Sequence, residues 1–242
     1  MNGSWRFIRL GGIGVRLHWS FSLLGAWMVL QATLGRRGWN GLAAMTTALI
    51  LLFASVLLHE LGHAVTARRL GLHVRDIIIL PVGGLVQVEV MPNRPWLDLL
   101  VAVTGPLVNL VLALSAAGLL AVWGKLGFLV GFLTSPDTVA AAMMATPFHR
   151  DALSGWLVFL LVVNGVLFLF NLLPAAPMDG GRMLAAGLSL ILPAGQAVRL
   201  ARRVGQGVVA LVLLAAIFLR SFELFVLAAL MMATGLLASS GQ

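Results

Sequence analysis

Two histidines four residues apart, His59 and His63, enclose a glutamate in the segment His-Glu-Leu-Gly-His. Side chains at positions i and i+4 of a helix lie on the same face, so both imidazoles can reach one metal ion. In this arrangement two histidines bind zinc and the glutamate acts as a base toward water. The spacing therefore predicts His59 and His63 as metal ligands and Glu60 as the catalytic base.

A catalytic zinc ion takes three protein ligands, and the chain has no cysteine to supply one. Within the apolar segments the best remaining acid is Asp179, which follows an interrupted span containing Pro174 and Pro177 and precedes Gly180-Gly181. Proline removes a backbone donor, and unwound backbone at membrane depth is tolerated only where protein or a watery cavity covers it. We therefore predict Asp179 as the third ligand.

The elements that position these residues are predicted to be membrane-spanning helices. Of the 242 residues, 60% are hydrophobic and 10% charged, and the mean hydropathy is +1.03, which is typical of a polytopic membrane protein. The net charge of +8 comes from basic residues dispersed between apolar runs. These are topology signals, and we predict no nucleic-acid partner.

We predict an all-α polytopic fold with about six transmembrane helices and a small membrane-associated β-hairpin after the second span. The hairpin is expected within residues 76–90, around Pro81-Val-Gly-Gly84. Residues 125–150 are expected to form a partly embedded loop or lid. The six spans are expected at Trp19–Gly35, Gly38–Arg68, Leu99–Gly124, Ala152–Leu173, Val204–Leu219 and Leu224–Ala238.

Basic residues between these spans predict the orientation. Eleven lie on one side and five on the other, so the positive-inside rule puts both termini in the cytoplasm of a prokaryotic-type cytoplasmic membrane. His59 precedes Arg68 by nine residues, or roughly 13 Å of helix. We therefore expect a metal site submerged in the bilayer and nearer its cytoplasmic face.

Two motifs together carry a family resemblance. The HExxH segment and the later segment Asn171-Leu-Leu-Pro-Ala-Ala-Pro-Met-Asp179-Gly-Gly181 resemble the site-2 protease family of intramembrane zinc metalloproteases, and the stretch Thr104-Gly-Pro-Leu-Val-Asn109 is similar as well. The resemblance covers roughly residues 10–190. It implies one domain over residues 1–242, without the PDZ or CBS domains of some relatives, in which the two spans of residues 204–238 form a candidate gate.

The resemblance also implies a function. One zinc ion per chain would be held by His59, His63 and Asp179, and Glu60 would pass a proton from water to the leaving amine. The expected partners are the lipid bilayer and a transmembrane protein substrate, cleaved near the cytoplasmic face to release a cytosolic factor; the oligomeric state is left open. Substrate-binding or structural support is expected from Asn171, Asn109, Gly83 and Gly84.

Some alternatives remain open from the sequence. Asn109 fits interhelical packing as well as it fits a functional role. A metal-binding transporter also builds ion sites from buried histidines and acids on broken helices, and an inactive relative would keep the metal without the reaction. Glu60 distinguishes these classes, since a protease uses it as a base and a transporter uses it as a ligand or proton relay.

Overall fold

A computed structural model describes residues 4–10, 12–20, 22–23, 25–26, 29–30, 38–80, 83–88, 94–135, 150–222, 224–229 and 231–232. The helices are α2 (Gly38–Arg69), α3 (Pro95–Val122), α4 (Gly127–Thr134), α6 (Arg150–Asn171), α7 (Asp179–Leu188) and α8 (Ala194–Phe218). The strands are β1 (Ser4–Leu10), β2 (Ile13–His18), β3 (Val74–Leu80) and β4 (Gly83–Val88).

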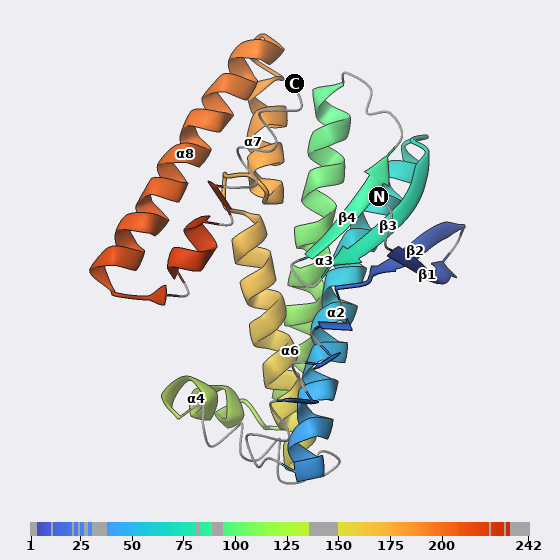
Figure 1. The fold of residues 1–242 in the computed structure, drawn as a ribbon, viewed down its shortest axis with the longest axis vertical. Coiled ribbons are helices and arrows are strands. Elements are labelled where there is room, and N and C mark those ends of the chain that lie inside the picture. The colour runs from blue at the N-terminus through green and yellow to red at the C-terminus, as the bar shows by residue number, and fades with distance from the viewer. Residues whose placement is uncertain are drawn as a thin grey trace.

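The centre of the fold is α3, which packs against α2, α6 and α7 (Figure 1). Leu120 of α3 and Val158 of α6 are fully buried in one apolar cluster. Ala44 of α2 packs with Trp156 of α6 in another. Because α3 contacts the other three helices, it can hold side chains from each of them in fixed relation.

Four described helices are long and apolar enough to cross a membrane: Gly41–Arg69, Pro95–Val122, Ala152–Asn171 and Ala194–Phe218. The chain is therefore an integral membrane protein, as its hydropathy predicts. The expected spans at Trp19–Gly35 and Leu224–Ala238 are only partly covered by the described residues, so the count of six stays a prediction. Of the expected loop at residues 125–150, the structure describes α4 and leaves residues 136–149 undescribed.

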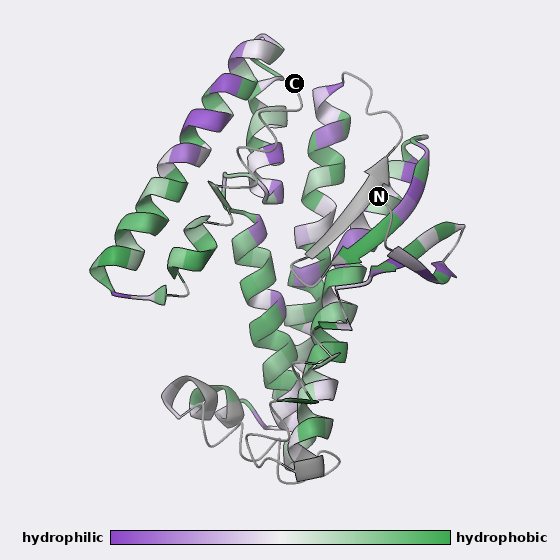
Figure 2. Cartoon of the chain, viewed as in Figure 1, coloured by the Kyte–Doolittle hydropathy of each residue, from purple (hydrophilic) through white to green (hydrophobic). Residues whose placement is uncertain are grey.

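The helix that contains the predicted span Val204–Leu219 begins ten residues before it, at Ala194. The first turns of α8 bury Ala197, Ala201 and Gly205 on one face. The arginines of this stretch are exposed, and Figure 2 shows the contrast between these polar turns and the apolar remainder of α8. These small residues let the first turns of α8 pack closely on the rest of the protein, while the arginines point outward.

The four strands form one sheet in the order β1-β2-β3-β4. β1 and β2 pair antiparallel, β2 and β3 parallel, and β3 and β4 antiparallel. β1 and β2 were not predicted from the sequence. They pair locally with each other, and β2 also pairs with β3, about 60 residues further along the chain. An ion pair of 2.9 Å between Arg16 and Asp76 crosses that parallel pair. The predicted association of β3 and β4 with the membrane stays a prediction.

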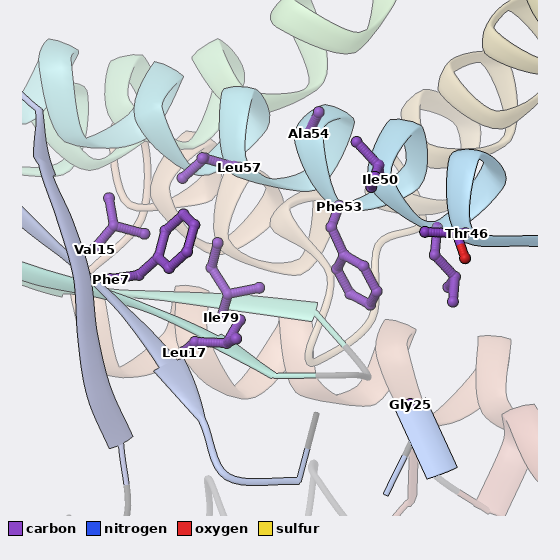
Figure 3. A pocket seen from close by; sticks show the side chains of 11 residues that line it. Phe7, Val15, Leu17, Gly25, Thr46, Ile50, Phe53, Ala54, Leu57 and Ile79 are labelled. Atoms are coloured by element: carbon purple, nitrogen blue, oxygen red, sulfur yellow. The ribbon is translucent and has the colours of Figure 1, made fainter. Parts of the chain in front are cut away.

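The sheet packs on the C-terminal half of α2. Ile13, Val15 and Ile77 are buried against Ala64 and Ala67, which follow the second histidine of the HExxH segment. Further back along α2, an apolar cavity of about 410 Å³ is lined by residues of the helix and of the sheet (Figure 3). Its lining includes Phe53 and Ile79 but none of the predicted metal ligands, so it belongs to the packing of the sheet on α2.

Candidate metal centre

The two histidines of α2 point at a single carboxylate. Nε2 of His59 lies 3.0 Å from Oδ2 of Asp179, and Nε2 of His63 lies 3.1 Å from the same oxygen. The two Nε2 atoms are 3.2 Å apart. All three side chains are buried. Helical spacing brings the two imidazoles together, and the tertiary fold adds an acid about 120 residues away.

Asp179 reaches this point because a helix is interrupted. α6 ends at Asn171, and α7 begins at Asp179 after a segment of turns. A Cβ atom on Gly180 would overlap the carbonyl oxygens of Leu172 and Leu173. Glycine at that position therefore lets the first turn of α7 fold back against the end of α6, which carries Asp179 toward α2.

The side chain of Asp179 lies in the first turn of α7. Its Oδ2 atom lies within 3.1 Å of the Nε2 atoms of both His59 and His63. The first turn of a helix also favours a negative side chain, because the free backbone N–H groups point toward it. A carboxylate in this position is ready to bind a cation.

One stripe of α3 faces the histidines. Nδ1 of His63 donates to the carbonyl oxygen of Val101 at 2.7 Å, and Nδ1 of His59 lies 3.0 Å from the side-chain amide of Asn109. Between them lies Gly105, where a Cβ atom would overlap the His63 ring. Positions 101, 105 and 109 are each one turn apart, so a single face of α3 supports both imidazoles.

These three side chains fit a zinc ion. Ligands about 2.0–2.1 Å from a tetrahedral zinc lie roughly 3.3 Å from one another. The three candidate donor atoms are separated by 3.0, 3.1 and 3.2 Å. Two histidine nitrogens and one carboxylate oxygen also make a donor set that zinc prefers, and each imidazole bonds through its other nitrogen to α3, as metal-binding histidines usually do.

Glu60 is buried beside this group and interacts electrostatically with His59, His63 and Asp179. It also interacts with Arg182, one turn after Asp179 on α7. Arg182 in turn forms an ion pair of 2.7 Å with Asp98 in the first turn of α3. A carboxylate next to the metal ligands, with a cation nearby, is placed to accept and return a proton.

The structure brings together His59, Glu60, His63, Asp179 and Asn109 from the predicted set. It does not bring Asn171 to them: the Asn171 side chain donates at 2.9 Å to the Leu167 carbonyl of its own helix. Gly83 and Gly84 lie in β4, paired with Leu80 and Ile79 of β3. The supporting roles predicted for these three residues stay predictions.

Sequence reasoning missed Val101 and Gly105 as parts of the site. Val101 acts through a backbone carbonyl, which every residue carries, so no sequence signal identifies it. Gly105 lies in the Thr104–Asn109 stretch, and its four-residue spacing from Asn109 was the available signal. Both positions acquire meaning only when α3 is packed against α2.

Comparison with known proteins places the chain in a family. The family model described as peptidase family M50 matches residues 47–215. A zinc metalloprotease of Methanocaldococcus jannaschii is 30% identical over 216 residues, which cover 88% of this chain and 54% of that protein. Stage IV sporulation protein FB of Bacillus subtilis is 32% identical over 154 residues, covering 63% of this chain and 44% of that protein. This chain thus spans about half the length of the curated relatives that it matches.

Among solved structures, the fold is similar to that of a site-2 protease from Methanocaldococcus jannaschii. The TM-score is 0.58 and the sequence identity 24%, and the match covers 96% of this chain and 93% of that one. At this identity the likeness supports the fold alone. The order of elements that positions the candidate metal centre is therefore shared with a known architecture.

Proposed function

The chain belongs to peptidase family M50, and from this premise we propose that it is an intramembrane zinc endopeptidase. It hydrolyses a peptide bond in or near a transmembrane segment of another protein. The observation that carries the proposal is the convergence of His59 Nε2, His63 Nε2 and Asp179 Oδ2 within 3.2 Å of one another, buried among apolar helices.

The residues divide the chemistry between them. His59, His63 and Asp179 hold one zinc ion, which supplies Lewis acidity for activating water and polarising a carbonyl. Glu60 takes the proton from the attacking water as its oxygen adds to the scissile carbonyl carbon, and then gives that proton to the amine nitrogen as the C–N bond breaks. Burial of the group keeps bulk water away from the reacting peptide.

Substrate binding is proposed at the free edge of the sheet. β4 is the last strand in the order β1-β2-β3-β4, so one side of it has no partner strand among the described residues. A transmembrane helix shields its peptide bonds, and it must unwind before it can be cleaved. An unwound segment can add to β4 through backbone hydrogen bonds, as extended peptides do at other sheet edges. Gly83 and Gly84 lie in this strand.

The orientation follows from the basic residues. Arg68 and Arg69 end α2 and mark its cytoplasmic end, which puts His59 and His63 inside the bilayer near that face. We extend the proposal to a chain with both termini in the cytoplasm and to a reaction that releases a cytosolic factor.

The first experiment measures zinc per chain in the detergent-purified protein and in three variants. We expect about one zinc per chain in the wild type, retention in Glu60→Gln and loss in Asp179→Ala. His73→Ala is the matched control, because His73 is an exposed histidine away from the site. Absence of zinc from the wild type after metal supplementation would overturn the proposal. Loss of zinc in Glu60→Gln would make Glu60 a ligand and favour a metal transporter.

The second experiment tests the reaction. The wild type and Glu60→Gln are reconstituted separately into vesicles with labelled membrane proteins of the host. Fragments that form with the wild type and not with Glu60→Gln identify an endopeptidase and its substrate. Zinc binding without Glu60-dependent fragments across the whole set would favour an inactive, metal-binding relative.

A further inference from the structure

Asn109 is fully buried on α3, with its side-chain amide 3.0 Å from Nδ1 of His59. As placed, the amide nitrogen Nδ2 faces the ring. The oxygen Oδ1 of Asn109 is buried and has no hydrogen-bond partner among the described residues. The oxygen and nitrogen of an asparagine amide are nearly identical in shape, so their assignment to the two positions is a choice. The contact can therefore be made with either end of the amide.

The two orientations have opposite consequences for His59. If Nδ2 donates to Nδ1, the neutral imidazole carries its proton on Nε2, and no lone pair faces Asp179 and His63. If Oδ1 accepts from Nδ1, the proton is on Nδ1, and the lone pair of Nε2 faces the other two donor atoms. Only the second orientation leaves a nitrogen that can bind a metal ion.

His63 makes the corresponding contact through Nδ1, but its partner on α3 is a group that can only accept. A backbone carbonyl can only accept, so the 2.7 Å contact of Nδ1 with the Val101 oxygen places a proton on Nδ1. When the ring is neutral, as a metal ligand must be, its lone pair is therefore on Nε2. The two Nε2 atoms lie 3.2 Å apart and share the same carboxylate oxygen. Two imidazoles converging on one cation need the same tautomer, and α3 can impose it on both.

We propose that Asn109 is a positioning residue of the metal centre: its side-chain oxygen accepts the Nδ1 proton of His59 and presents the Nε2 lone pair to the metal. Val101 does the same for His63 through its backbone. One face of α3 therefore selects the tautomer of both ligands before the metal arrives. This inference rests on the proposed function in taking the metal to be zinc.

Two variants of Asn109 separate hydrogen bonding from packing. Asn109→Asp keeps the shape and can only accept, so it preserves the proposed contact with Nδ1–H of His59. Asn109→Leu fills the same space and cannot accept. We expect Asn109→Asp to bind zinc within about 10-fold of the wild type and Asn109→Leu to bind it roughly 10–100-fold more weakly, which is the usual effect of losing such a partner.

Asn164→Leu is the matched control. Asn164 is also fully buried, also bridges to α2 by donating at 3.0 Å to Ser55 Oγ, and also has an unpartnered Oδ1 among the described residues. It lies on α6 and contacts no metal ligand through the hydrogen bonds of its amide. We expect it to lower thermal stability and leave the zinc affinity of the folded protein unchanged.

Zinc affinity is measured in detergent by competition with a chromophoric chelator, and the His59 tautomer of the metal-free wild type by ¹⁵N NMR of labelled histidine. Asn109→Asp as weak as Asn109→Leu, or Asn109→Leu as tight as the wild type, would overturn the inference and leave the proposed function standing. A wild type that binds no zinc overturns the proposed function. In that case the NMR still decides this inference, since a proton on Nε2 of His59 would refute it.

Discussion

Gly105 of α3 lies directly against the imidazole of His63. A Cβ atom at Gly105 would overlap the ring of His63 and lie 2.7 Å from Nε2 of His59. The absent side chain leaves the space in which the two ring nitrogens meet Asp179. Val101 and Asn109 contact the rings from the turns on either side, so one face of α3 supports both candidate metal ligands.

We predict that Gly105→Ala displaces the imidazoles and weakens zinc binding by at least about 10-fold, because metal ligands tolerate distance errors of only about 0.2 Å. Chelator competition measures the change. Gly118→Ala is the control on the same helix, since a Cβ there meets nothing within 4 Å. Wild-type zinc affinity in Gly105→Ala would contradict this prediction, because it would show that the site can accommodate the methyl group.

We expect zinc binding to be equally sensitive to a substitution at Gly180, at the start of α7. Gly180→Ala sets a methyl group against the carbonyl oxygens of Leu172 and Leu173, which forces the first turn of α7 and its Asp179 away from α2. We predict a loss of zinc comparable to that in Asp179→Ala, measured as zinc per folded chain. Gly187→Ala, in the same helix with open space around it, should keep its zinc. Equal zinc contents in the two glycine variants would contradict the prediction.

Removing the metal should lower the stability of the wild type. A ligand that binds only the folded state stabilises it by about 2.7 kcal/mol when its free concentration is 100 times Kd. For a domain of this size that corresponds to roughly 5–10 °C in Tm. We predict this decrease when a chelator is added to the wild type and almost none in Asp179→Ala, by thermal unfolding in detergent. A decrease of the same size in both proteins would mean that the chelator acts elsewhere.

Zinc affinity should fall as the pH falls. Binding requires both imidazoles neutral and Asp179 ionised, so protons compete with the metal. The donors for which protons compete are Nε2 of His59, Nε2 of His63 and a carboxylate oxygen of Asp179. Each donor that carries a proton should weaken binding by up to about 10-fold for each further pH unit. A titration of bound zinc against pH measures this slope, and affinity that is constant down to pH 5 would contradict it.

Much of the metal centre could be predicted from the sequence, because its main signals are local. His59 and His63 share a helix face through spacing alone, and Asp179 stands out as an acid beside a proline-broken helix in an otherwise apolar chain. Mean hydropathy likewise determines that the chain resides in a membrane. The match to peptidase family M50 confirms the family that these motifs indicate.

Only the tertiary structure decided which groups surround the ligands. The Val101 carbonyl, the space at Gly105 and the amide of Asn109 meet the histidines because α3 packs against α2, and neither a backbone carbonyl nor an empty volume has a sequence signal of its own. The pairing of β2 with β3 and the early start of α8 were missed for the same reason. Periodicity reports how a segment folds locally, whereas the contacts between distant segments depend on the packing of the whole chain.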